Sequence, residues 1–274
     1  SSSSPGISLK SEGLSYLAGS DLPALIVNVQ RGGPGLGGIQ PSQADYFQAT
    51  KGGGHGDFKM IVLAPSSVQE MADLTVKGFD LADKYRMPTM LLADGTMGQM
   101  MEPVSLDYEV KETVDKPWAT TGTKMEREHN IVTSLFLKPD ELEDLVVERY
   151  ERYKVVEENE VMYEEYMMDD ADICIAAFGI AARVAKNAIN EARKQLEKVN
   201  LNFQNHVLVV AQDIDEIVAL MCYIQLSLLG VAAYIKVGDV FTQPMSTDDN
   251  GENYWFTMMY FSDVWTMRRV FHSL

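Results

Sequence analysis

The fold is decided by Asn28-Val29-Gln30-Arg31-Gly32-Gly33-Pro34-Gly35-Leu36-Gly37-Gly38, where a strand breaks abruptly into glycine and proline. The apolar residues 23–29 that lead into it are rich in branched side chains, which is typical of a strand buried on both faces. Glycines let a backbone approach a ligand closely, and ligands of open α/β sheets bind beyond the carboxyl ends of the strands. Arg31 therefore lies where an anion would bind, and its guanidinium can hold a carboxylate or a phosphate through two parallel hydrogen bonds.

Two further buried strands are predicted at residues 59–64 and 89–93, with helices at 43–50 and 68–84 between the three strands. Capping signals mark the starts of these helices, namely Ser42 for the first and Ser66, Ser67, Gln69 and Glu70 for the second. Buried strands that alternate with helices indicate a parallel sheet with crossover helices. The predicted fold class is therefore α/β.

The second half of the chain continues this alternation after a surface linker over 102–136. The predicted elements are a long acidic amphipathic helix from Pro139 to about Met168, strands at 172–178, 207–211 and 231–237, and helices at 180–194 and 214–229. The aromatic tail 239–274 remains unassigned. The acidic helix has two interpretations, a solvated face of a helix that links two domains, or a docking face for a basic partner.

Composition excludes several classes of function. The 274 residues carry a net charge of −17, which argues against nucleic acids and anionic membranes as partners, because both attract clustered Lys and Arg. No run of 18 apolar residues suggests a membrane span, and the first residues lack the pattern of a signal peptide. Two cysteines, Cys174 and Cys222, cannot supply the four thiolates of an iron–sulfur cluster, and no metal site is predicted. A cytoplasmic location is expected.

His55 is the second candidate for chemistry, because it lies between glycines and shortly before Asp57. A His–Asp pair on a loop could transfer protons, or His55 could simply be hydrogen-bonded to the backbone. Arg31 likewise has a structural alternative, an ion pair with a nearby carboxylate. Neither of the two glycine-rich nucleotide fingerprints is met, because no such motif opens a helix after a strand.

Three stretches carry a resemblance to a known family: Ser1–Leu9, Asn28–Gly38 and Gln40–Asp57. They resemble the alpha subunit of 2-oxoacid:ferredoxin oxidoreductases. The branched-chain type, which acts on 3-methyl-2-oxobutanoate (2-ketoisovalerate), is the most similar, because the 2-oxoglutarate type shares Arg-Gly-Gly-Pro but usually diverges after it. The similarity continues to about Arg193, through the stretches Leu91–Gly95, Gln99–Pro103 and Asn159–Val161.

The resemblance implies a thiamine diphosphate pyrimidine-binding domain followed by a transketolase C-terminal-like α/β domain. Its implied limits are 1–105 for the first domain, 106–168 for the linker and acidic helix, and 169–274 for the second domain, with 194–274 divergent. The family's enzymes oxidatively decarboxylate a 2-oxoacid, form an acyl-CoA and reduce ferredoxin. By resemblance, Arg31 would bind the substrate carboxylate, whereas Ser4 and Gly6 would lie near thiamine diphosphate.

The remaining parts of such an enzyme are expected in other chains. A beta subunit would carry the diphosphate–Mg²⁺ site, and an iron–sulfur subunit would carry the clusters. The family's activating Glu and substrate loop, which precede the serine run, do not occur in this sequence, and the sequence after Arg193 departs from the family. A non-catalytic scaffold or assembly subunit is therefore an alternative, as is a 2-oxoglutarate- or pyruvate-specific paralogue.

Overall fold

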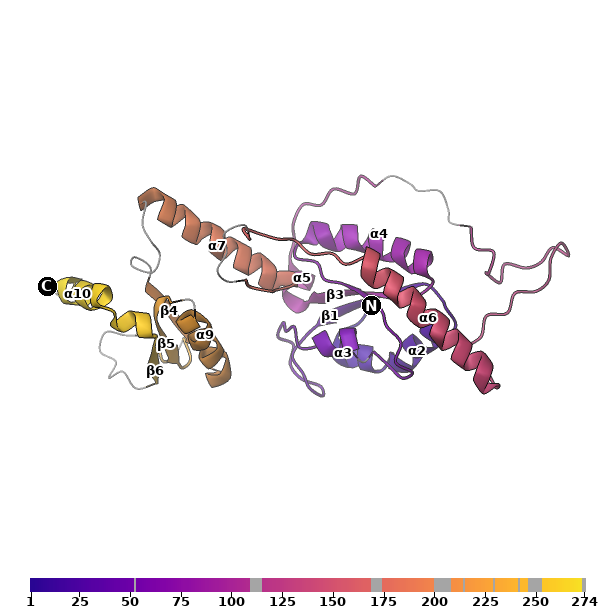
Figure 1. Ribbon diagram of the computed structural model, residues 1–274, viewed down its shortest axis with the longest axis horizontal. Coiled ribbons are helices and arrows are strands. Elements are labelled where there is room, and N and C mark those ends of the chain that lie inside the picture. The colour runs from indigo at the N-terminus through magenta and orange to yellow at the C-terminus, as the bar shows by residue number, and fades with distance from the viewer. Residues whose placement is uncertain are drawn as a thin grey trace. The chain divides into compact units, whose positions relative to one another are not determined.

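The chain forms two compact units in the computed structural model, and Figure 1 shows the elements of each. The structure describes residues 1–51, 53–108, 115–168, 174–199, 208–213, 215–228, 230–240, 242–245 and 253–272. The first unit comprises Ser1–Asp170 with Ile175–Lys186, and the second comprises Ala171–Cys174 with Asn187–Leu274. The finer division predicted at residue 105 stays a prediction.

The first unit is built on a parallel sheet of three strands, β1 (Ala24–Gln30), β2 (Ile61–Leu63) and β3 (Pro88–Asp94), in the order β1-β3-β2. In the register, Ala24 lies opposite Pro88 and Gln30 lies opposite Asp94. Every residue of the central strand β3 is buried, as expected for a strand covered on both faces. The three predicted strands and the α/β class are therefore confirmed.

Helices cover both faces of this sheet (Figure 1). They are α1 (Ser4–Ser8), α2 (Ser11–Gly19), α3 (Tyr46–Lys51), α4 (Val68–Tyr85) and α6 (Pro139–Asn159), whereas the short α5 (Gly95–Gln99) follows directly after the end of β3. One core joins α1, α2 and α3 to the sheet through buried side chains such as Ile7, Leu14 and Ala49. The opposite core joins α4 and α6 to the sheet through Leu81 and Tyr153. The sheet is thus the middle of three layers.

The predicted N-cap at Ser67 is confirmed, and Glu70 completes a variant of the capping box by binding the residue before the N-cap. Ser67 Oγ accepts the N–H of Glu70 at 3.1 Å, and the Glu70 carboxylate accepts the N–H of Ser66 at 2.7 Å. The predicted start of α3 at Ser42 is wrong, because the helix begins at Tyr46 and its first carbonyl acceptor is that of Asp45, which binds the N–H of Ala49.

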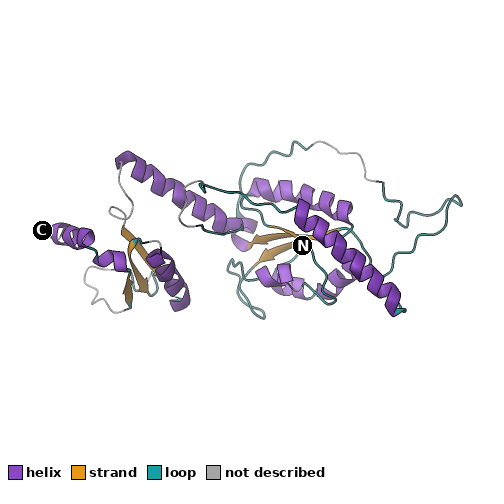
Figure 2. Cartoon of the chain, in the orientation of Figure 1, coloured by secondary structure: helices purple, strands orange, loops and turns teal. Residues whose placement is uncertain are grey.

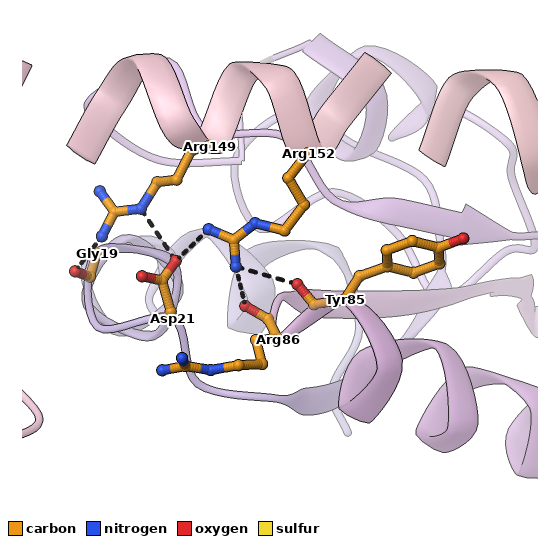
Figure 3. Close-up of polar contacts among 6 residues, drawn as sticks. All are labelled: Gly19, Asp21, Tyr85, Arg86, Arg149 and Arg152. Carbon is orange, nitrogen blue, oxygen red and sulfur yellow. Dashed lines mark hydrogen bonds and ion pairs between the residues drawn. The ribbon is translucent and has the colours of Figure 1, made fainter. Parts of the chain in front are cut away.

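Helix α6 is fastened to the sheet layer by two arginines (Figure 3). Arg149 Nε and Arg152 Nη2 both donate to Asp21 Oδ1, at 3.0 and 2.7 Å. The other acceptors of these guanidinium groups are backbone carbonyl oxygens near the ends of α2 and α4, those of Gly19, Tyr85 and Arg86. The predicted acidic helix is therefore present and packed within the first unit, although it ends at Asn159 rather than near Met168.

Figure 2 draws the described residues of the chain between α5 and α6 as loop, as predicted for 102–136.

The second unit contains β4 (Leu208–Asp213), β5 (Ala232–Val237) and β6 (Tyr254–Phe256), with β4 and β5 parallel and β6 antiparallel to β5. Its helices are α9 (Glu216–Leu228), the 3-10 helix η1 (Met258–Phe261) and α10 (Asp263–His272), and α7 (Gly179–Val199) contributes residues to both units. The strands predicted at 207–211 and 231–237 are confirmed over their described residues. Asp215 caps α9, because its carboxylate accepts the N–H groups of Ile217 and Val218.

The strand predicted at 172–178 is wrong over residues 174–178, which have no regular secondary structure, and residues 172–173 lie outside the described part. Ile175 is 65% exposed. An apolar run forms a buried strand only where a neighbouring strand offers backbone partners, and none of the strands in the described residues pairs with 174–178. The helix predicted to follow is confirmed as α7.

None of the described helices has the length and apolarity needed to cross a membrane.

We expect Asp21→Asn to lower the free energy of unfolding by roughly 1–2 kcal/mol, because two largely buried guanidinium groups lose their shared negative charge. Asn tolerates the positive φ of +48° at this position, so the backbone is not strained. Urea unfolding followed by circular dichroism measures the loss. Glu148→Gln makes the same chemical change on the exposed face of α6, and an equal loss in both variants would contradict the role of Asp21.

The end of α6 gives a pH-dependent prediction. Lys84 Nζ and the Tyr85 hydroxyl donate to Glu160 Oε1, both at 2.6 Å, and these bonds, that of Lys84 first, keep the pKa of Glu160 below its ordinary value. A depressed folded-state pKa stabilises the protein above the unfolded pKa of about 4.3, and this stabilisation is lost as the pH falls through the folded pKa. The difference in unfolding free energy between the native chain and Glu160→Gln should therefore be constant near neutrality and shrink in acid. A difference that grew in acid would contradict it.

Candidate functional site

The carboxyl ends of the parallel strands meet at one edge of the first sheet. β1 ends at Gln30 and β3 ends at Asp94, and these two residues lie side by side in the register. The glycine-rich loop, residues 31–45, begins at this edge with Arg31 and leads to α3. The loop follows β1 in the position where α/β proteins bind their ligands.

The guanidinium of Arg31 is held by its own loop. Nη1 donates to the carbonyl oxygens of Leu36 and Gly38, at 2.5 and 2.8 Å, and Nε donates to Ser3 Oγ at 3.2 Å. Within the described residues no carboxylate pairs with Arg31 and no partner binds Nη2. The structural alternative of an ion pair is therefore not seen there. The loop fixes the side chain through neutral acceptors and leaves its positive charge for an anion.

Gly37 makes the tight path of this loop possible. Its φ is +57°, and a Cβ at this position would lie 1.7 Å from the carbonyl oxygen of Gly32. Two backbone hydrogen bonds close the turn, from the N–H of Gly38 to Gly32 at 3.0 Å and from the N–H of Gly32 to Gln40 at 2.9 Å. Only glycine combines this conformation with such a close approach, so the loop can wrap round the guanidinium.

Ser4 and Gly6 shape the chain beside Arg31. The Ser4 hydroxyl accepts the backbone N–H of Arg31 at 3.0 Å and donates to its carbonyl oxygen at 3.2 Å. A Cβ on Gly6 would lie 1.9 Å from Ser2 Oγ, so a larger residue at this position would require the Ser2 hydroxyl to move. The structure therefore brings Ser4 and Arg31 together, and the part that Ser4 and Gly6 play toward a cofactor stays a prediction.

His55 lies in different surroundings. It is exposed, its backbone N–H donates to Ser15 Oγ at 2.9 Å, and its ring meets the Tyr16 ring edge-on with centroids 6.4 Å apart. Among the described residues, no hydrogen bond or ion pair joins the imidazole to Asp57 or to Arg31. The suggested His–Asp pair is not formed there, and the role of His55 stays a prediction.

Sequence reasoning missed two buried amides, Asn28 and Gln30, whose side chains are 0% and 1% exposed. Asn28 Nδ2 donates to Asp45 Oδ2 at 3.1 Å, and Gln30 Oε1 accepts the backbone N–H of Asp45 at 2.9 Å. Asn28 Oδ1 and Gln30 Nε2 have no partner among the described residues. The sequence does contain a signal for these buried amides. Ile26, Asn28 and Gln30 alternate along β1, so the two amides lie on the same face of the strand as the apolar Ile26.

The start of α7 is also held at this edge of the first unit. Gln43 Nε2 donates to the carbonyl oxygen of Phe178 at 3.0 Å. The Glu102 carboxylate accepts from Arg183 at 2.5 Å and from the N–H of Val68 at 3.2 Å, and these two bonds, Arg183 first, lower the pKa of Glu102. Glu102 therefore joins α4 to α7, a role that its place in the sequence did not single out.

The chemistry of this edge suits a small anion. Arg31 and the glycine backbone provide a cation and close approach, which fit a carboxylate. Within the described part of the chain, no three His, Cys, Asp or Glu side chains are placed to hold a metal ion.

Comparison with known proteins assigns the first unit to a family. Residues 1–168 match the sequence profile of the pyruvate flavodoxin/ferredoxin oxidoreductase, thiamine diphosphate-binding family. The chain is 56% identical over 201 residues to the ketoisovalerate oxidoreductase subunit VorB of Methanothermobacter marburgensis, an alignment that covers 73% of this chain and 57% of that protein. It is 47% identical over 112 residues to the 2-oxoglutarate synthase subunit KorA of Methanothermobacter thermautotrophicus, covering 40% of this chain and 29% of that protein.

The fold has a counterpart among solved structures. A 2-oxoglutarate:ferredoxin oxidoreductase from Magnetococcus marinus, solved with 2-oxoglutarate, coenzyme A and succinyl-CoA, superposes with a TM-score of 0.59 at 24% identity, over 86% of this chain and 49% of that one. At this identity the likeness concerns the fold. The chain spans 57% of the length of the VorB protein that it matches. The match over residues 1–168 shows that the chain belongs to the thiamine diphosphate-binding family of pyruvate flavodoxin/ferredoxin oxidoreductases.

Proposed function

We propose that this chain is part of a heteromeric oxidoreductase that converts a branched-chain 2-oxoacid and CoA into an acyl-CoA and passes the electrons to ferredoxin. The substrate class is supported by the VorB relative, which is named for ketoisovalerate and aligns over 73% of this chain. The KorA relative, named for 2-oxoglutarate, aligns over 40%. The longer and closer alignment favours 3-methyl-2-oxobutanoate as substrate.

The observation that carries this proposal is how the side chain of Arg31 is held. Its guanidinium stands at the carboxyl edge of the sheet, is held by neutral acceptors, and forms no ion pair with a described residue. A 2-oxoacid has a carboxylate, which a guanidinium group can bind through two parallel hydrogen bonds. Arg31 would bind and orient the substrate carboxylate, and the glycine loop would allow the close approach that such binding requires.

The other functions of the enzyme are assigned to partners. When bound, thiamine diphosphate would supply the chemistry that decarboxylation of a 2-oxoacid requires, and Ser4 and Gly6 are the residues of this chain proposed to lie near it. The diphosphate–Mg²⁺ site is proposed for a beta subunit. The two cysteines of this sequence are too few for a Cys₄ cluster, so the iron–sulfur clusters that reduce ferredoxin are proposed for another subunit of a cytoplasmic complex.

Arg31→Ala should lower kcat/KM for 3-methyl-2-oxobutanoate by about 10- to 100-fold, because a charge-assisted hydrogen-bonded pair is lost. The assay is 2-oxoacid- and CoA-dependent reduction of a viologen dye by the complex purified through this chain. Ser3→Ala, which removes only the acceptor for Nε, should have a much smaller effect. An unchanged kcat/KM in Arg31→Ala would overturn the site, and a native preference for 2-oxoglutarate or pyruvate would overturn the substrate class.

His55 is proposed as a proton-transfer residue, because it lies between Gly54 and Gly56 and is exposed. His55→Gln should then lower kcat by about 100-fold, the usual size of a lost general acid or base. Gln keeps the polarity of the side chain but cannot transfer a proton as an acid or a base. A His55→Gln complex with native kcat would remove His55 from the mechanism.

A further inference from the structure

Hydrogen bonds hold both ends of the glycine-rich loop, the first end to α1 and the second end to β1. At the near end, Ser4 binds both backbone groups of Arg31, at 3.0 and 3.2 Å. At the far end, Asp45 is bound by Asn28 through its carboxylate and by Gln30 through its backbone N–H. The loop therefore leaves β1 at Arg31, and its last residue, Asp45, is hydrogen-bonded to the same strand.

The two amides are costly residues at these positions. Both are almost fully buried, and each has one polar atom, Asn28 Oδ1 and Gln30 Nε2, that meets no partner among the described residues. An unpaired buried polar atom destabilises a protein, whereas an apolar residue of similar shape would not. Ile26, two positions earlier on the same face, shows that an apolar residue suits this core. Stability alone does not account for Asn28 and Gln30, but their two bonds to Asp45 do.

The position of the loop in turn sets the position of the guanidinium. Arg31 Nη1 binds the carbonyl oxygens of Leu36 and Gly38, which lie between the two attached ends. If Asp45 were released, these carbonyl groups would lose one of the two attachments that define where they stand. The guanidinium would then be held by a loop whose position is less sharply defined.

We propose that Asn28 and Gln30, acting through Asp45, are positioning residues that fix the glycine-rich loop and so determine where Arg31 presents its charge. The inference rests on the proposed function, in which Arg31 binds the carboxylate of a 2-oxoacid. Asn28, Gln30 and Asp45 would not touch the substrate. Their effect would appear in the binding of the 2-oxoacid and not in the binding of CoA.

Asp45→Ala and Asp45→Asn form the decisive pair of variants. Ala removes the acceptor for Asn28, whereas Asn keeps an oxygen at the same place, and both keep the backbone N–H that Gln30 binds. In the purified complex, Asp45→Ala should raise KM for 3-methyl-2-oxobutanoate by about tenfold, because small displacements of a binding group weaken binding strongly. kcat and KM for CoA should stay within about twofold, and Asp45→Asn should restore most of the loss.

Gln30→Met tests the second attachment, because it removes the acceptor for the Asp45 N–H at nearly constant volume, and it should raise the same KM. Thr89→Val is the matched control for stability. Thr89 is fully buried in the same sheet and donates to the carbonyl oxygen of Gly78 at 3.0 Å, but it lies near the opposite end of β3, opposite Leu25. It should lower thermal stability without changing KM for the 2-oxoacid.

The possible outcomes separate this inference from the proposed function. A tenfold rise in KM in Asp45→Ala and Gln30→Met, rescue in Asp45→Asn and no rise in Thr89→Val would support the positioning role. If Arg31→Ala weakens the enzyme but Asp45→Ala and Gln30→Met leave KM unchanged, the inference is overturned and the proposed function stands. An equal rise in Thr89→Val would also overturn it. If Arg31→Ala has no effect, the proposed function itself fails.

Discussion

The parallel pairing of β1 with β3 is the constraint on which the rest of the first unit depends. It places Gln30 beside Asp94, so that both strands end at the same edge and the chain must leave β1 at Arg31. The two helical layers can then pack on opposite faces, because Leu25 and Val27 point to one core and Ile26 to the other. Once this pairing forms, the glycine-rich loop must begin at the carboxyl edge of the sheet.

The sequence predicts those parts of the structure that depend on local chemistry. The strands up to residue 94 are apolar runs with clear ends, and the capping box at Ser67 needs only residues three positions apart, so both could be read directly. The bonds from Asn28 and Gln30 to Asp45 span 15 to 17 residues and no periodic pattern indicates them. The failed strand at 174–178 shows the converse error, because an apolar run says nothing about whether a partner strand exists.

The same distinction applies to the candidate site. Arg31 could be chosen from its setting alone, since a cation among glycines at a strand end is a local signal. That its guanidinium is held by Leu36, Gly38 and Ser3 could not be predicted, because these contacts depend on how the loop turns. His55 looked similar in sequence, yet the structure gives it Ser15 and Tyr16 as neighbours.

The neutral acceptors around Arg31 have a consequence for how an anion reaches the site. The whole chain carries a net charge of −17, so its field repels an approaching anion at long range. At contact, the guanidinium of Arg31, which pairs with no carboxylate of the described residues, attracts the anion. Dissolved salt screens charges farther apart than about 8 Å at physiological ionic strength. It would therefore weaken the distant repulsion more than the close attraction, and moderate salt would speed the entry of an anionic ligand instead of slowing it.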